Sequence, residues 1–181
     1  MIRSVVAATA VAAAAASVSS RAFYENFGSK EECFLAAFDA VIAHLSELIS
    51  EAAAPETDWA HQVIAALRVS LRFFAAEPDL ARICIIEPVA ATPAITARFR
   101  AVVESAVPYL EAGRAERLDN DSLPESTEDS LLGGFITLAS RSVALGDPVT
   151  LERRLPDLAE FILSPCLGAE AAKRLATEAA A

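Results

Sequence analysis

Tyr24, Ser29 and Lys30 lie close together in the sequence, and their side chains suit the binding of a phosphate group. Ser29 is a good N-cap, so a helix is expected to begin directly after it, with Lys30 in its first turn. The first backbone amides of a helix have no partner within the helix and attract anions. Free amides beside a lysine and a tyrosine hydroxyl form a natural seat for a phosphate.

A short helix, a sharp stop and an immediate restart would position these groups. Phe23 and Phe27 are four residues apart and share one helix face, so they would anchor the first helix to a core. Gly28 can adopt the left-handed conformation that ends a helix. Glu32, three residues after Ser29, completes a capping box for the second helix. The alternative interpretation is an amphipathic helix pair that packs and has no further role.

Residues 18–32 resemble the end of the DNA-binding helix-turn-helix of the TetR family of transcriptional repressors, which reads Val-Ser-x-x-Thr-x-Tyr-x-His-Phe-x-Ser-Lys-Glu. Ala22 replaces the threonine of the family, and the residues that match are Val18, Ser19, Tyr24, Phe27, Ser29, Lys30 and Glu31. The resemblance implies that Ser20 and Arg21 approach bases, whereas Tyr24, Asn26 and Lys30 hold phosphates. The full DNA-binding set that it implies is Ser19, Ser20, Arg21, Tyr24, Asn26 and Lys30.

The residues before this block are few for a TetR-type head, which has three helices. Seventeen residues precede Val18, which leaves room for the second helix but not for a normal first one. Ser17 replaces the turn glycine of the family, and Ala12 stands where the family has a large apolar residue. We therefore expect an incomplete helix-turn-helix head.

The same stretch permits a second interpretation, as a secretory signal peptide. Arg3 followed by the apolar run 5–16 has the order of such a peptide. Against this, the run is mostly alanine, and the three cysteines are scattered without a visible disulfide framework. A helix-turn-helix directly downstream also favours a cytoplasmic protein.

Composition limits the classes of function. The formal charge of −10 has the wrong sign for non-specific nucleic-acid binding, so any DNA contact must be local. No run of eighteen or more strongly apolar residues is visible, so we expect no membrane partner. The sequence contains no His-Glu-x-x-His, Cys-x-x-Cys or Gly-x-Ser-x-Gly motif and no phosphate-binding or dinucleotide-binding glycine loop. We therefore expect no metal, no cofactor and no enzymatic activity.

Apolar spacings of three and four predict helices throughout, and hence an all-α fold. The expected helices cover residues 29–53, 59–76, 79–87, 94–112, 126–145, 149–163 and 169–180, with a kink or restart at Pro156. We expect two domains, the incomplete head at 1–45 and a helical bundle for ligand binding and dimerisation at 46–181.

The body could contain a mostly apolar pocket with a few polar groups, which is the usual composition of a small-molecule site. Glu87 and Arg141 would orient the ligand, and the full candidate lining is Phe73, Phe74, Cys84, Glu87, Phe99, Tyr109, Phe135 and Arg141. For each of these residues, plain core or a solvated charge is the alternative role.

The two long helices near the C-terminus are the candidate dimer interface, because the resemblance implies a four-helix bundle formed with a second copy. Gly134 follows Gly133, and such a pair leaves room for the close approach of another helix. The candidate interface residues are Leu131, Gly134, Phe135, Leu138, Leu155, Leu158, Phe161 and Ile162. The alternative is that they belong to the core of a single chain.

These observations predict a homodimeric, TetR-like DNA-binding regulator, a repressor that responds to a small and largely apolar ligand. Its partners would be a DNA operator, the small-molecule effector and a second copy. The alternative is a dimeric sensor or decoy subunit that has lost DNA binding through truncation at its N-terminus.

Overall fold

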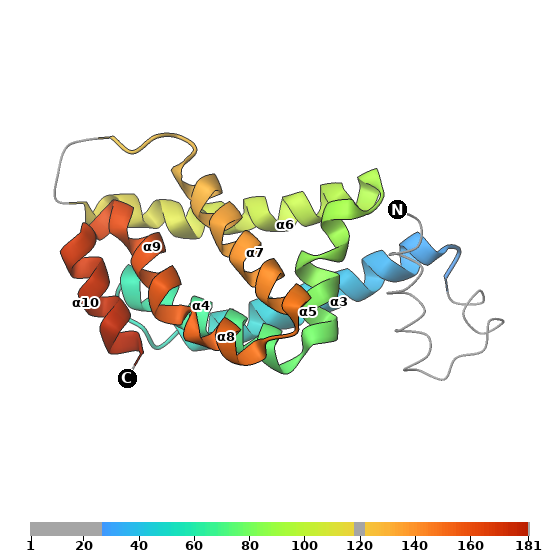
Figure 1. The fold of residues 1–181 in the computed structure, drawn as a ribbon. Coiled ribbons are helices and arrows are strands. Elements are labelled where there is room, and N and C mark those ends of the chain that lie inside the picture. Colours follow the sequence, from blue (N-terminus) through green and yellow to red (C-terminus); the bar gives the residue numbers. More distant parts are fainter. Residues whose placement is uncertain (1–26, 118–121, 181) are drawn as a thin grey trace.

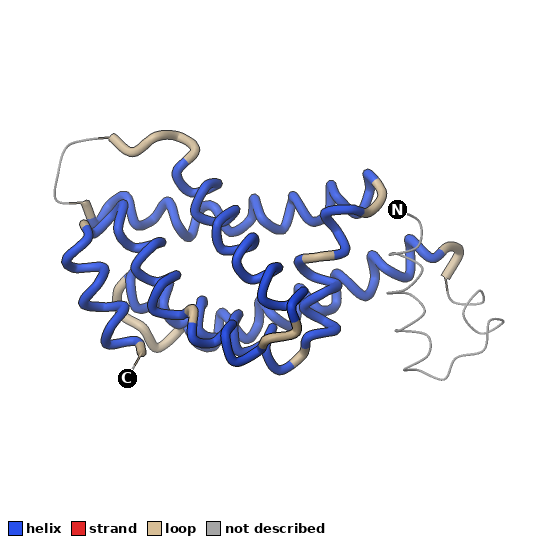
Figure 2. The backbone as a smooth tube through the Cα atoms, viewed as in Figure 1, coloured by secondary structure: helices blue, strands red, loops and turns tan. Residues whose placement is uncertain are grey.

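The computed structural model describes residues 27–117 and 122–180, and every regular element within these ranges is a helix (Figure 2). The predicted all-α class is therefore confirmed. Residues 18–26, which carry most of the TetR-like motif, lie outside the described part of the chain.

The observed helices follow the predicted ones closely at most ends. The long elements are α3 (Lys30–Ala53), α4 (Trp59–Ala76), α6 (Pro93–Glu111), α7 (Thr127–Leu145), α9 (Leu155–Leu167) and α10 (Ala169–Ala179). The short ones are α5 (Pro78–Ile85), the 3-10 turns η1 (Glu87–Ala90) and η2 (Ala112–Glu116), and α8 (Pro148–Arg153).

One predicted helix is two helices in the structure. The segment expected at 149–163 is divided between α8 and α9, because α9 restarts at Leu155 with Pro156 in its first turn. Proline has no backbone N–H to donate but fits the start of a helix, so Pro156 marks a restart here and not a kink.

The main core is the apolar cluster built around α4, against which α3, α5, α7, α8 and α9 pack (Figure 1). Its most deeply buried large side chains are Leu71, Leu151, Leu158 and Leu163. The sole tryptophan, Trp59, is also buried here. Its indole Nε1 donates a hydrogen bond of 2.8 Å to the Tyr109 carbonyl oxygen at the end of α6.

A second and much smaller apolar cluster joins α3 to α6. Its buried members are Phe34, Phe38 and Ile95, with Phe99 among the partly buried side chains that pack against them. We call this group the α3–α6 cluster. It fixes the first half of α3, which extends away from the rest of the body in Figure 1, whereas the second half of α3 reaches the main core.

By length and composition, α3 could also cross a membrane. An 18-residue window of this helix has a mean hydropathy of 1.6, and 17% of it is buried. The bent pair formed by residues 78–90 and 93–116 passes the same test if it is counted as one span. Core helices of soluble proteins pass this test as well, so it assigns no compartment.

Candidate functional site

The start of α3 is the described part of the predicted phosphate-binding motif. Ser29 has an extended backbone, and its Oγ accepts a hydrogen bond of 3.0 Å from the Glu32 amide. The Glu32 carboxylate accepts a hydrogen bond of 2.8 Å from the amide of Gly28. The first bond of the predicted capping box, from the Glu32 amide to the Ser29 side chain, is thus confirmed. In the second bond, the Glu32 side chain binds the amide of Gly28, one residue before the N-cap residue that the standard motif uses.

Gly28 differs from the prediction. Of the described glycines, Gly146 and Gly168 have a positive φ, and Gly28 does not. Its N–H faces the Glu32 carboxylate instead, so the turn into α3 is held by a hydrogen bond and does not use a left-handed residue.

The electrostatic character of this helix start is mixed. Lys30 is exposed, and Glu31 and Glu32 follow it within the first turn. The two carboxylates stabilise the positive end of the helix dipole, but they also reduce the local attraction for a phosphate. Lys30 is the one described member of the predicted DNA-binding set. The other members, Ser19, Ser20, Arg21, Tyr24 and Asn26, lie outside the described residues.

The structure brings together part of the predicted ligand pocket. Phe73 and Phe74 are buried in the main core, with ring centroids 5.9 Å apart. Phe135 of α7 packs beside Phe74 at 6.4 Å. Cys84 is also buried in this core, and burial raises the pKa of its thiol to about 12, so it stays protonated at neutral pH.

The polar members of the predicted pocket do not converge on these rings. Glu87 is buried beside Arg82, with 3.4 Å between their charged atoms. Phe99 belongs to the α3–α6 cluster, Tyr109 is 75% exposed and Arg141 is exposed. The aromatic group is therefore assembled without the two orienting charges, Glu87 and Arg141, that the sequence suggested.

The predicted close approach of a helix at the glycine pair occurs within the chain. A Cβ added to Gly134 of α7 would lie 2.9 Å from the Phe161 ring of α9, whereas one added to Gly133 would meet nothing within 4 Å. Only glycine therefore lets Phe161 lie this close to α7. The Phe161 side chain is still 46% exposed, so it also presents apolar surface to solvent.

The other predicted interface residues fall into two groups. One group is buried within the single chain and stabilises it whether or not a dimer forms: Leu131, Leu155, Leu158 and Ile162. Phe135 and Leu138 are partly buried, as is Gly134. The surface left for a second copy is thus centred on Phe161 and the adjoining face of α7.

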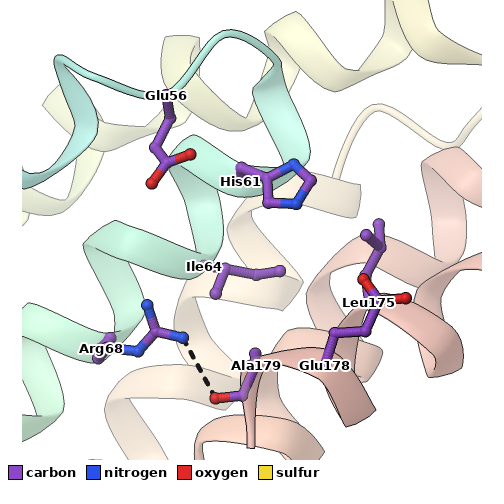
Figure 3. A pocket seen from close by; sticks show the side chains of 7 residues that line it. All are labelled: Glu56, His61, Ile64, Arg68, Leu175, Glu178 and Ala179. Carbon is purple, nitrogen blue, oxygen red and sulfur yellow. Dashed lines mark hydrogen bonds between the residues drawn. The ribbon is translucent and has the colours of Figure 1, made fainter. Parts of the chain in front are cut away.

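Two adjoining surface hollows were not foreseen from the sequence. The smaller, of about 160 Å³, lies between α4 and α10 and is lined by Glu56, His61, Ile64, Arg68, Leu175, Glu178 and Ala179 (Figure 3). The larger, of about 760 Å³, is lined by Arg68, Leu71, Arg72, Glu152, Arg153, Leu155, Pro156, Ala179 and Ala180. Arg68 and Ala179 belong to both, and Arg68 Nη2 donates a hydrogen bond of 3.2 Å to the Ala179 carbonyl oxygen.

One lining residue of the smaller hollow, His61, forms a titrating pair with Asp58 at the start of α4. The Asp58 carboxylate caps α4 and lies 2.7 Å from His61 Nδ1. Hydrogen bonding to Asp58 raises the pKa of His61, and the His61 backbone N–H and side chain in turn lower the pKa of Asp58. The only sequence signal for either hollow was the spacing of Arg68 and Arg72, which puts them on one face of α4.

The described residues contain no group of three or more His, Cys, Asp or Glu side chains that could hold a metal ion. In comparisons with known proteins, no family model, no curated protein and no solved structure matches this chain. A function for this chain is therefore inferred from its own residues.

Proposed function

We propose that this chain is a TetR-like transcriptional regulator that binds DNA through its N-terminal segment and a small, largely apolar ligand through its body. The observation that carries the proposal is the motif at residues 18–32 together with the capped start of α3. The motif supplies the side chains for bases and phosphates, and the hydrogen bonds at Ser29 and Gly28 fix where α3 begins after it.

The path of α3 supports a link between the two functions. Its exposed Lys30 would contact a DNA phosphate, and the helix continues for 24 residues into the main core. A helix held at both ends in this way transmits a change in the body to the DNA-binding end, provided that ligand binding favours one arrangement of the helix. The buried Phe73 and Phe74, with the partly buried Phe135 beside them, support an apolar ligand.

Dimerisation through α7 and α9 completes the proposal. The half-exposed Phe161 ring on Gly134 offers an apolar centre for contact with a second copy. Two copies related by a twofold axis would present two DNA-binding segments to successive major grooves, which are about 34–36 Å apart.

A binding assay with the whole chain tests the proposal. Fluorescence anisotropy would be measured with labelled DNA from upstream of its own gene and with a shuffled fragment of equal length, at about 50 mM and about 200 mM salt. We expect preference for the upstream fragment and a loss of affinity of at least about tenfold at the higher salt, because phosphate contacts release counterions. Equal, weak binding to both fragments would contradict the proposal.

The acidic character of the helix start favours a second candidate, a dimeric sensor that does not bind DNA. Glu31 and Glu32 directly follow Lys30, the one cation in the first turn of α3, and the whole chain carries a formal charge of −10. The same assay separates the two candidates when it is combined with sedimentation equilibrium. A stable dimer without preference for any DNA fragment identifies the sensor.

A further inference from the structure

The larger hollow concentrates positive charge on an acidic protein. Arg68 and Arg72 reach it from α4, and Arg153 reaches it from α8. Among the described residues that line it, Glu152 is the one acidic side chain. The chain as a whole carries 25 acidic and 15 basic side chains, so this local excess of arginine runs against the overall balance.

Within the described residues, the three arginines that line this hollow form no ion pairs. Arg68 is held by its hydrogen bond to the Ala179 carbonyl, which carries no formal charge. Arg72 and Arg153 form no ion pair in the described part of the chain, although Arg153 attracts Asp147 from a greater distance and helps to lower the pKa of that carboxyl. The next arginine along, Arg154, is paired with Asp157. Like charges gathered around one hollow repel each other, and an anion between them removes that cost.

The floor of the hollow is apolar. Leu71 and Leu155 are buried members of the main core, and Pro156 is partly buried beside them. A volume of about 760 Å³ is within the usual range for small-molecule sites. Guanidinium groups above an apolar floor match a molecule that has an oxyanion at one end and an apolar group at the other.

From this arrangement we infer that the hollow between α4, α8 and the end of α10 binds a small organic anion, such as an aryl phosphate or an aryl carboxylate. The oxyanion is held by Arg72 and Arg153, with Arg68 oriented beside them, and the apolar group lies on Leu71 and Leu155. The inference does not depend on DNA binding. It adds a site outside the aromatic group of the main core.

Isothermal titration calorimetry of the whole chain in a phosphate-free buffer tests the inference. The probes are phenyl phosphate, benzoate and inorganic phosphate. We expect phenyl phosphate to bind more tightly than inorganic phosphate because its ring covers the apolar floor. Binding of benzoate as well assigns the site to organic anions in general, and binding of phenyl phosphate alone assigns it to phosphate esters. No heat from either aryl compound, or equal affinity for phenyl phosphate and inorganic phosphate, overturns the inference.

Matched substitutions locate the binding. Arg72→Gln and Arg153→Gln should each weaken phenyl phosphate binding by about fivefold, a modest effect because both side chains are exposed. Glu152→Gln should strengthen it. Arg100→Gln removes the same charge from an exposed position on α6 and should change nothing. Equal weakening by Arg72→Gln and Arg100→Gln would show a response to net charge alone and would refute the site.

Discussion

The two apolar clusters of this chain differ in size and in how far the ion pair beside each of them is buried. The main core draws on every helix from α3 to α10, whereas the α3–α6 cluster has Phe34, Phe38 and Ile95 as its buried members. The buried carboxylate of Glu128 pairs with Arg114 at 2.7 Å at the edge of the main core. The α3–α6 cluster is supported by an ion pair between Arg98 and Asp39 with both partners about half exposed.

This difference indicates that the first half of α3 is the less stable end of the helix. Local opening is easiest where few apolar side chains are buried and ion pairs are exposed. The end of α3 that begins at Lys30 can therefore loosen while the main core stays folded. Under the proposed function, this is the end that adjoins the DNA-binding motif.

Truncation of a main-core side chain should have the largest effect. Leu158 is 1% exposed, so Leu158→Ala should lower the free energy of unfolding by about 2–5 kcal/mol through lost burial and a cavity. Urea unfolding followed by the fluorescence of Trp59, the sole tryptophan, reports on this core directly. Leu158→Met keeps most of the volume and should cost less than about 1.5 kcal/mol. Equal losses for both variants would contradict a close-packed core.

The matching truncation in the α3–α6 cluster should have a smaller and local effect. Phe38 is fully buried, yet Phe38→Ala should lower the free energy of global unfolding by only about 1–2 kcal/mol, because opening of this end limits the loss. Hydrogen exchange should become faster in residues 30–42 and 93–102 and stay unchanged in α9. Phe38→Leu serves as the conservative control. Faster exchange throughout the chain would show that the two clusters unfold as one unit.

The ion pair between the buried Glu128 and the partly exposed Arg114 gives a third effect, which depends on pH. The Arg114 guanidinium lowers the pKa of Glu128, so the pair stabilises the fold above the unfolded-state pKa of about 4.3 and loses this effect as pH falls through the folded-state value. Glu128→Gln should cost about 1–2 kcal/mol at pH 7 because a charge-assisted hydrogen bond is lost. The difference from wild type should shrink in urea melts below about pH 4. A difference that does not change with pH would refute an ionic origin.

We expect the smallest effect on stability from the exposed pair of Asp58 and His61 at the start of α4. Because Asp58 raises the pKa of His61, the histidine should titrate above its ordinary value of about 6.5 in NMR spectra. The pair stabilises the fold below that ordinary value, and this contribution is lost as pH rises through the folded-state pKa. Asp58→Asn should return the midpoint toward 6.5. An unchanged midpoint in this variant would exclude Asp58 as the cause.

Much of the fold was predictable because it depends on local signals. Local sequence signals mark several helix ends. Ser29 and Asp58 cap the starts of α3 and α4, and Gly146 ends α7 in the left-handed conformation. The division at Leu155 was harder to predict, since Pro156 is compatible with either a kink or a restart.

The sites were less predictable because they depend on residues far apart in the chain. Arg72 and Arg153 line one hollow although 80 residues separate them, and no periodicity along the sequence relates α4 to α8. Glu87 and Arg141 were expected to share one pocket because each is a charge on an apolar helix. In the structure Glu87 is buried beside Arg82, whereas Arg141 is exposed. For the glycine pair, the sequence predicted a close approach of another helix. The structure has it at Gly134, where the Phe161 ring of α9 lies close, whereas nothing lies within 4 Å of a Cβ added at Gly133.

The central claim is that the start of α3 contacts DNA, and the two lysines of the chain test it most directly. Lys30 begins α3 and Lys173 is exposed on α10, so Lys30→Gln and Lys173→Gln remove the same charge from the two ends of the protein. In the anisotropy assay with the upstream fragment, Lys30→Gln should weaken binding and lower the salt slope by about 1, whereas Lys173→Gln should match wild type. Equal behaviour of the two variants would contradict the claim.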